Sequence, residues 1–230
     1  MFVGELPVPR IQFHQSLAEL KDKLLAMAAL SQQALDAALD GYFKADASLC
    51  HYVYENEPAI NSAERELDEM AYDLLAMQQP MAIDLRFILA VIKINSDLER
   101  IGDQSVNIAR LTEAVLHEPK VELPVDIEAM GEFSVSMIRM AVQSLLEADT
   151  DLAERVLIMD DVIDEMNRKA HGALMKVMEA GSPAAMQALN ALIIARNLER
   201  ISDHATNIAE DVIFWVRGAD VRHKLTTFAE

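Results

Sequence analysis

The sequence predicts an all-α protein made of two tandem, pseudo-repeated three-helix bundles. Between residues 10 and 217 it is rich in the helix formers Ala, Leu, Met, Glu and Gln. No stretch alternates polar with apolar residues for long enough to indicate a sheet. Two segments, DLERIGDQSVNIA at 97–109 and NLERISDHATNIA at 197–209, are identical at eight of thirteen positions. Such a repeat is typical of a duplicated unit.

The spacing of apolar residues predicts six long helices. In the first, Leu17, Leu20, Leu24, Met27 and Leu30 recur at intervals of three and four, as on one face of an amphipathic helix. We place the six helices at 10–42, 46–78, 83–116, 124–147, 150–179 and 184–217.

Turn residues mark the helix ends. Gly41 and the KAD sequence at 44–46 are expected to end the first helix, with Asp46 as the N-cap of the second. The GSP sequence at 181–183 closes the fifth helix, and HEPKVELP at 117–124 holds two prolines. These breaks predict a first bundle at 10–116, a linker at 117–123, a second bundle at 124–217 and a C-terminal tail at 218–230.

The repeat extends beyond the two signature segments. With an offset of 103 residues, Met27 matches Met130 and Asp46 matches Asp149. The offset falls to 100 after the loop MAIDLRF at 81–87, which is about three residues longer than its counterpart. A loop therefore absorbs the length difference while the helices keep their register.

The charge balance excludes some classes of partner. The chain carries 38 acidic against 20 Lys and Arg residues, a net charge of −18. Such a surface repels phosphate backbones, which argues against nucleic-acid binding. It suits cations or a partner with a basic face.

The sequence predicts a cytoplasmic protein without membrane insertion. The start MFVGELPVPRIQF shows no basic segment followed by an apolar one, so no signal peptide is visible. The apolar run at 87–92 is too short to span a bilayer. Cys50 has no second cysteine to pair with, which fits a reducing compartment and a small core residue.

Each signature segment places three polar side chains on one helix face, four residues apart: Glu99, Asp103 and Asn107 in the first, Glu199, Asp203 and Asn207 in the second. Two carboxylates at this spacing repel each other by a few tenths of a kcal/mol. Either Arg100 and Arg200 pair with acids on a neighbouring helix, or a bound cation lies between the acids.

The preceding helix of each half carries a second polar row. On the fifth helix it consists of Asp160, Asp164, Asn167 and His171, and its counterpart on the second helix consists of Glu57, Asn61, Glu64 and Asp68. All of these side chains can bind a metal, and three-helix packing would bring the rows beside the signatures. Carboxylates with an occasional imidazole favour divalent or trivalent iron, manganese or magnesium. The alternative is an acidic face balanced by arginines, without metal.

The paired signatures resemble those of the PhoU family, and WVRGADVRHK at 215–224 is similar to the C-terminal close of that family. The resemblance covers roughly residues 12–224 and implies two tandem three-helix bundles. It also implies multinuclear metal clusters held by E/DxxxD motifs. The pairs that match this motif are Glu99 with Asp103, Glu199 with Asp203, and Asp160 with Asp164.

The second helix departs from the family pattern. Asn61 stands where the motif has an acid, and Pro58 follows Glu57. Since a proline disfavours helical geometry in the residue before it, Glu57 is expected to face away from the site. We therefore predict that the second-half site binds metal more tightly than the first.

The resemblance implies a negative regulator of the phosphate-starvation response and of phosphate uptake. Such a protein is a non-enzymatic adaptor between a phosphate ABC transporter ATPase (PstB-like) and a sensor histidine kinase (PhoR-like), and forms a homodimer. The alternative function is a carboxylate-bridged metalloenzyme on a helical bundle. Against the enzyme, neither signature helix contains the Glu-x-x-His motif of di-iron bundle enzymes.

Overall fold

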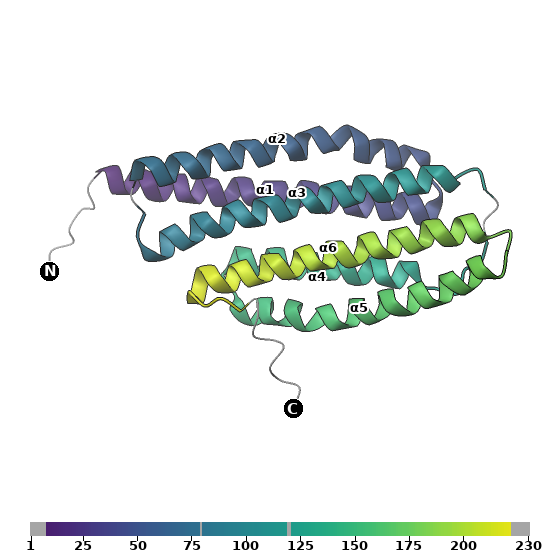
Figure 1. Cartoon of the computed structure of the whole chain (residues 1–230). Helices are drawn as coiled ribbons and strands as arrows, with labels where there is room; N and C mark the ends of the chain where they lie inside the picture. The colour runs from purple at the N-terminus through teal and green to yellow at the C-terminus, as the bar shows by residue number, and fades with distance from the viewer. Residues whose placement is uncertain (1–7, 79, 119–120, 222–230) are drawn as a thin grey trace, which may run out of the picture.

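A computed structural model describes residues 8–78, 80–118 and 121–221, and within these ranges every regular element is a helix (Figure 1). The six helices are α1 (Val8–Lys44), α2 (Ala47–Gln78), α3 (Ala82–Val115), α4 (Ile127–Glu147), α5 (Thr150–Glu179) and α6 (Ala185–Arg217). The predicted all-α fold is confirmed, and the predicted helix bounds differ from these by at most three residues.

The helices form two three-helix bundles that lie side by side along their length (Figure 1). Helices α1, α2 and α3 pack against one another in the first bundle, and α4, α5 and α6 in the second. The bundles meet through α3 with α6 and through α1 with α4. The buried apolar side chains of both halves join into one continuous cluster. The two repeats therefore share a core, since each must cover an apolar face of the other.

The geometry of the two halves repeats as the sequence predicts. Asp149 accepts hydrogen bonds from the backbone N–H groups of Asp151 and Leu152 at the start of α5. Asp46 accepts one in the same way from the N–H of Ser48, at 2.8 Å. The residue before each cap, Ala45 or Ala148, has a left-handed φ of 54°. Met27 and Met130 are both buried.

Two predicted helix bounds need correction. Gly41 does not end α1, which continues to Lys44. Its missing side chain instead allows close packing, because a Cβ at Gly41 would lie 3.2 Å from Sγ of Cys50. Helix α4 begins at Ile127 rather than at 124, because the Asp126 carboxylate caps it by accepting from the backbone N–H of Ala129.

Polar contacts fasten α3 to α6 across the boundary between the bundles. Nδ1 of His204 lies 2.8 Å from Oδ1 of Asp97. Nearer the C-terminus of α6, Nζ of Lys93 donates to Oδ1 of Asp211 at 2.7 Å, and the Asp211 side chain is 8% exposed. In both contacts the acid is largely buried, so the pairs favour one register of the two helices.

None of the described helices combines the length and apolar character that a bilayer crossing requires.

Candidate metal centre

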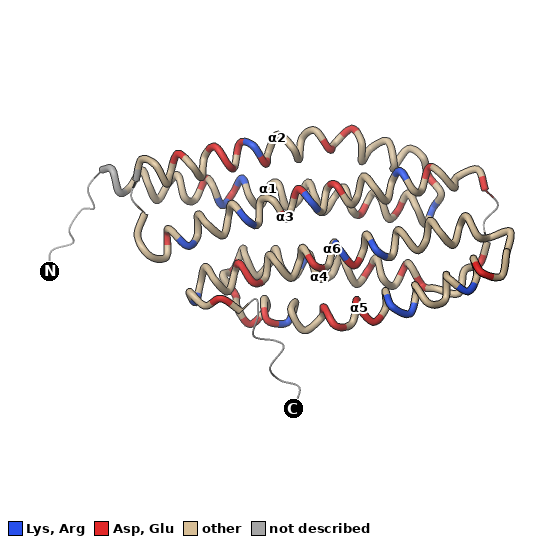
Figure 2. Tube along the Cα trace, viewed as in Figure 1, with Lys and Arg blue, Asp and Glu red and all other residues tan. Residues whose placement is uncertain are grey.

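The acids of the second signature lie at the edge of the contact between α5 and α6. Leu198, Ile201 and Ala205 point into the core and are fully buried. Glu199, next to Leu198, is half-buried, and Asp203, between Ile201 and Ala205, is exposed, so both lie at the border of the buried face. Acidic residues occur along both α5 and α6 (Figure 2), and these two helices pack against each other.

Four carboxylates from these two helices influence one another, and we call them the α5–α6 acidic cluster: Asp160, Asp164, Glu199 and Asp203. Burial, followed by the charges of Asp203, Asp164, Asp161 and Glu199, raises the pKa of Asp160 to about 6. A raised pKa means that the ionised form is disfavoured at this place in the fold.

The two signature acids show the same effect. Desolvation raises the pKa of Glu199, and the charge of Asp203 adds to it, while Arg196 and Arg200 act in the opposite direction. Desolvation also raises the pKa of Asp203, followed by the charge of Asp164. The pKa of both acids is therefore raised on balance, although Arg196 and Arg200 lower it.

Two carboxylate oxygens of the cluster lack hydrogen-bond donors. Oδ1 of Asp160 and Oε2 of Glu199 are enclosed and have no hydrogen-bond partner in the structure. Enclosed polar atoms are nearly always paired, so each such oxygen calls for a donor or a cation. A cation at either oxygen would be a hard one, since both atoms belong to carboxylates.

The cluster is not a ready-made ligand shell. Among the described residues, no three His, Cys, Asp or Glu side chains are grouped closely enough to hold an ion as they stand. Since carboxylate side chains at the border of a helix contact can rotate about χ1 and χ2, binding would require them to converge on the ion.

The first half holds a smaller α2–α3 acidic cluster, made of Glu64, Glu99 and Asp103. Burial raises the pKa of Glu99, followed by the charges of Asp103 and Glu64. Nε of Arg100 lies 3.8 Å from Oε2 of Glu99 on its own helix. The ion pair that the structure gives Arg100 is thus with an acid of its own helix.

The departures from the repeat on α2 leave this helix intact but reduce its charge. Helix α2 continues through Pro58, and Glu57 is half-buried. Asn61 supplies a neutral amide at the position of Asp164. Oδ1 of Asp68 already accepts a hydrogen bond from Nδ2 of Asn95, at 3.0 Å.

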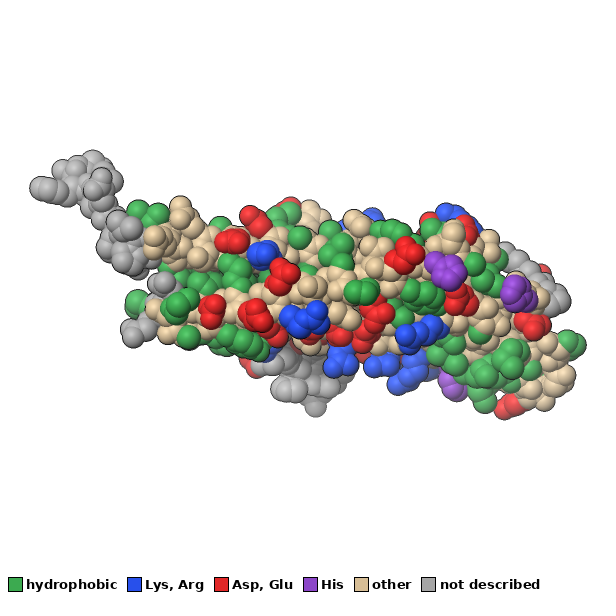
Figure 3. Space-filling view, turned by 90° about the horizontal axis from the view of Figure 1, so that it is seen from above, with side chains coloured by type: hydrophobic (Ala, Val, Ile, Leu, Met, Phe, Trp, Pro, Cys, Tyr) green, Lys and Arg blue, Asp and Glu red, His purple; other side chains and the backbone are tan. Residues whose placement is uncertain are grey.

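The remaining predicted ligands differ in their contacts and exposure. Nδ2 of Asn207 donates to Oδ1 of Asp97 on α3, at 3.1 Å, and so contributes to the contact between the bundles. Asn107 and Asn167 are half-buried, and His171 is exposed. The acidic side chains on the face seen in Figure 3 are likewise separated by apolar, polar and basic ones.

Sequence reasoning missed two acids. Oδ1 of Asp97 contacts the side chains of both His204 and Asn207 on α6. Its counterpart in the repeat is the neutral Asn197, and this difference in charge was the available signal. Asp161 adds to the raised pKa of Asp160, although neighbouring residues on a helix point about 100° apart.

The sequence of the chain matches a known protein family. The PhoU domain matches twice, over residues 24–112 and 127–212. The chain belongs to the PhoU family. The two matched ranges correspond to the two halves of the fold, and the gap between them includes the linker.

Several relatives in the PhoU family span most of the chain. The PhoU homolog 1 of Thermotoga maritima is 33% identical over 219 residues, which cover 95% of this chain and 94% of the relative. The homolog of Pseudomonas aeruginosa is 37% identical over 92% of this chain and 88% of its own length. The Escherichia coli protein, named phosphate-specific transport system accessory protein PhoU, is 30% identical over 92% and 88%.

Solved PhoU structures have the same fold. The crystal structure of PhoU from Pseudomonas aeruginosa superposes with a TM-score of 0.85 at 36% identity, covering 90% of this chain and all of that one. The Streptococcus pneumoniae PhoU structure gives a TM-score of 0.83 at 24% identity, over 91% and 99%. The predicted architecture of two three-helix bundles agrees with both.

Proposed function

We propose that this protein is an accessory regulator of phosphate-specific transport. Its membership of the PhoU family carries this proposal, since relatives that align with more than nine-tenths of the chain bear the name of a phosphate-specific transport system accessory protein. In this role it restrains phosphate uptake and the phosphate-starvation response when phosphate is plentiful, and it has no catalytic turnover of its own.

The regulator works as an adaptor in the cytoplasm. Its partners are the ATPase of a phosphate ABC transporter and a sensor histidine kinase, and it acts as a homodimer. Its net charge of −18 supports docking on basic partner surfaces. The long helices of both bundles offer rigid faces for such contacts, because each is held along its length by two or more neighbours.

Metal binding belongs to the proposed function. In the second half, Asp160, Asp164, Glu199 and Asp203 would hold iron, manganese or magnesium. The enclosed and unpaired oxygens of Asp160 and Glu199 support this assignment. In the first half, Glu99 and Asp103 would hold a second, weaker site with Glu64. A bound cation would neutralise the repulsion within each cluster and tie α5 to α6 or α2 to α3.

The function is tested by deleting the gene and measuring alkaline phosphatase in phosphate-rich medium. Loss of the regulator should release the starvation response, so phosphatase activity should be high despite abundant phosphate. Reintroducing the wild-type gene should restore repression. Normal repression in the deletion strain would contradict the assignment as a regulator.

A further inference from the structure

The two ends of the boundary between the bundles are related by the internal repeat. Helices α3 and α6 run antiparallel across this boundary (Figure 1). Residues near the ends of these helices that are 100 positions apart therefore lie at opposite ends of the molecule. At each end, the last turn of α3 or α6 lies beside the first turns of the other. Helices α1 and α4 pack beside them. The two ends should look alike wherever the repeat is kept.

One end, which we call the filled junction, is closed by aromatic side chains. The rings of Phe87 and Trp215 pack with their centroids 4.9 Å apart. Nζ of Lys21 lies 5.7 Å from the centroid of the Trp215 ring and donates to the backbone oxygen of Leu146 at 2.8 Å. Nε of Arg86 donates to the backbone oxygen of Trp215, at 3.1 Å. Phe87, Lys21 and Arg86 thus all contact Trp215 at this end.

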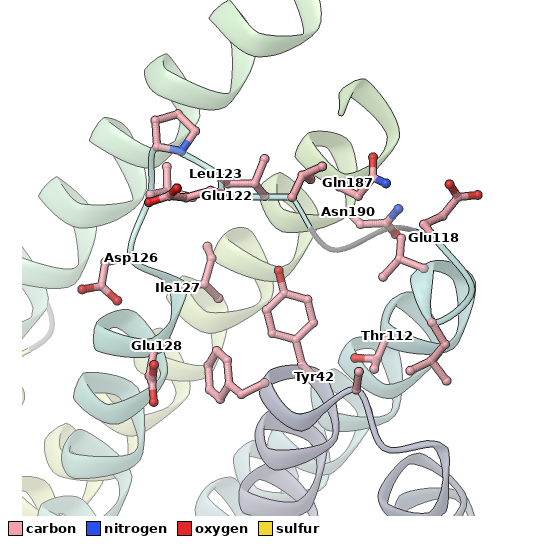
Figure 4. Close-up of a pocket in the computed structure, with 17 residues that line it drawn as sticks. Tyr42, Thr112, Glu118, Glu122, Leu123, Asp126, Ile127, Glu128, Gln187 and Asn190 are labelled. Carbon is pink, nitrogen blue, oxygen red and sulfur yellow. The ribbon is translucent and has the colours of Figure 1, made fainter. Parts of the chain in front are cut away.

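The opposite end, the open junction, lacks these groups. The counterparts of Trp215 and Phe87 are Val115 and Gln187, and Pro124 stands in place of Lys21. A cavity of about 740 Å³ lies between these residues (Figure 4). Its volume falls within the range of small-molecule sites in proteins, about 300–1,000 Å³. The absence of the Phe87 and Trp215 rings thus coincides with a cavity large enough for a ligand, whose walls carry the rings of Tyr42 and Phe43 in place of Leu145 and Leu146.

The walls of the cavity carry polar groups that the filled junction lacks. Its polar side chains include four that replace apolar residues of the filled junction: Tyr42, Thr112, Gln187 and Asn190 stand where the other end has Leu145, Val212, Phe87 and Ala90. All four apolar counterparts are buried. A junction that had merely become looser would need no new polar groups, whereas a few polar groups on an apolar wall are typical of ligand sites.

The polar groups at the open junction offer hydrogen bonds that the protein leaves unused. Oε1 of Gln187 is enclosed and has no hydrogen-bond partner. Nδ2 of Asn190 donates to the backbone oxygen of Met186 at 3.0 Å. Tyr42 extends from the end of α1 into the cavity, opposite the α6 wall that carries Gln187 and Asn190 (Figure 4). An acceptor without a donor in an enclosed wall favours a ligand with an N–H or O–H group.

The charge around the cavity restricts the ligand further. The acidic residues Glu118, Glu122, Asp126 and Glu128 line it, and none of the described lining residues is Lys, Arg or His. An anion would meet four carboxylates on walls where no described residue offers a counter-charge, which disfavours phosphate and other anions. A neutral or cationic molecule meets no such barrier.

We propose that the open junction binds a small neutral or cationic molecule with an aromatic ring and a hydrogen-bond donor. Its ring takes the space that Phe87 and Trp215 occupy at the filled junction. Its donor binds Oε1 of Gln187 once the enclosed side-chain amide turns toward the cavity. The molecule contacts α1, α3 and α6 together, so it joins the two bundles at the end that lacks the aromatic pair.

The proposal is tested on the full chain with three probes of similar shape: neutral indole, cationic tryptamine and anionic indole-3-acetate. Ligand-observed NMR and thermal melting at millimolar concentrations measure binding. Indole and tryptamine should bind saturably and raise the melting temperature. Indole-3-acetate should bind at least about tenfold more weakly, because it must approach the four carboxylates.

Two variants locate the binding. The double variant Val115→Trp with Gln187→Phe copies the filled junction, and it should raise the melting temperature and abolish binding of all three probes. Gln187→Leu keeps the shape of the side chain but removes the unpaired oxygen, so it should fold and bind indole several-fold more weakly. Val162→Phe adds an aromatic ring at an exposed site on α5 and should leave binding unchanged.

Three results would overturn the proposal. These are no saturable binding of indole or tryptamine to the wild-type protein, wild-type binding by the double variant, and preference for the anionic probe. If the double variant does not fold, undiminished binding of indole by Gln187→Leu overturns it in the same way.

Discussion

Nδ1 of His204 and Oδ1 of Asp97 lie 2.8 Å apart and connect α6 of one bundle to α3 of the other. Both side chains are largely buried, with exposed fractions of 16% and 14%. Their counterparts in the repeat, Gln104 and Asn197, each leave a buried polar atom without a partner. The repeat therefore places a His–Asp contact at one point of the boundary and two amides with unpartnered atoms at the equivalent point.

Breaking this contact should destabilise the protein. Asp97→Asn and His204→Gln, which copy the residues of the other half, should each lower the free energy of unfolding by about 1–2 kcal/mol, because a largely buried partner is left unpaired. The double variant should cost less than the sum of the two. Chemical denaturation at neutral pH measures all three values.

The exposed pair of Lys44 with Asp40 is the matched control. Its side chains are 62% and 53% exposed, so Lys44→Ala should cost less than about 0.5 kcal/mol. Strictly additive effects of Asp97→Asn and His204→Gln would show that the two residues do not act as a pair.

The acidic cluster between α5 and α6 should make the metal-free protein less stable as the pH rises. The pKa of Asp160 lies at about 6 in the folded protein, above its ordinary 3.8. Between about pH 4 and pH 6 the folded protein therefore binds more protons than the unfolded chain, so this residue lowers the free energy of unfolding with rising pH. Urea denaturation with a chelator present, repeated across this range, measures the slope.

Asp160→Asn removes this contribution. The variant should be more stable than the wild-type protein at pH 7, by on the order of 1 kcal/mol once solvent screening is allowed for. Its free energy of unfolding should also change less with pH. Asp22→Asn, an exposed change on α1, should keep the wild-type slope. A less stable Asp160→Asn variant in the absence of metal would contradict the raised pKa.

Loss of metal should differ between the two halves. Asp203→Ala should remove more metal than Asp103→Ala, because the α5–α6 cluster has four acids whereas the first half has Asn61 in one of the corresponding places. Elemental analysis of protein purified without chelators gives the ratio of metal to chain for each variant. Equal losses would contradict the ranking of the sites.

Two glycines in helices should respond differently to alanine. A Cβ added at Gly172 would meet no atom within 4 Å, so Gly172→Ala should gain about 0.5–1 kcal/mol from helix propensity alone. At Gly41 the new Cβ would lie 3.2 Å from Sγ of Cys50, and crowding should offset most of that gain. Thermal melting compares the two, and Cys50→Ala should restore the gain at Gly41. An equal gain at both glycines would contradict the tight packing.

The fold could be predicted from the sequence because its signals are local and repeated. Apolar residues such as Leu17, Leu20 and Leu24 mark the buried face directly, and the signatures mark equivalent helices in both halves. Gly41 misleads because a glycine near the end of a helical pattern resembles a C-cap. Only the position of Cys50 on α2 reveals that its role is close packing.

Less of the candidate site than of the fold could be predicted from the sequence. The spacing of Glu199 and Asp203 predicts a shared face, and their raised pKa values agree with a crowded acidic site. Spacing within one helix says nothing about partners across the bundle boundary, so it reveals neither Asp97 nor the hydrogen bond that Asn207 donates to it. The contrast between Gln187 and Phe87 is likewise visible in the repeat, but its meaning depends on the cavity.

Complementation of the deletion strain tests most directly whether the acidic cluster carries the regulation. The strain should receive the wild-type gene, the Glu199→Gln with Asp203→Asn variant, or the Asp22→Asn control, at matched protein levels. Alkaline phosphatase activity in phosphate-rich medium should be repressed by the wild-type and control genes and remain high with the double variant. Full repression by the double variant would contradict the account.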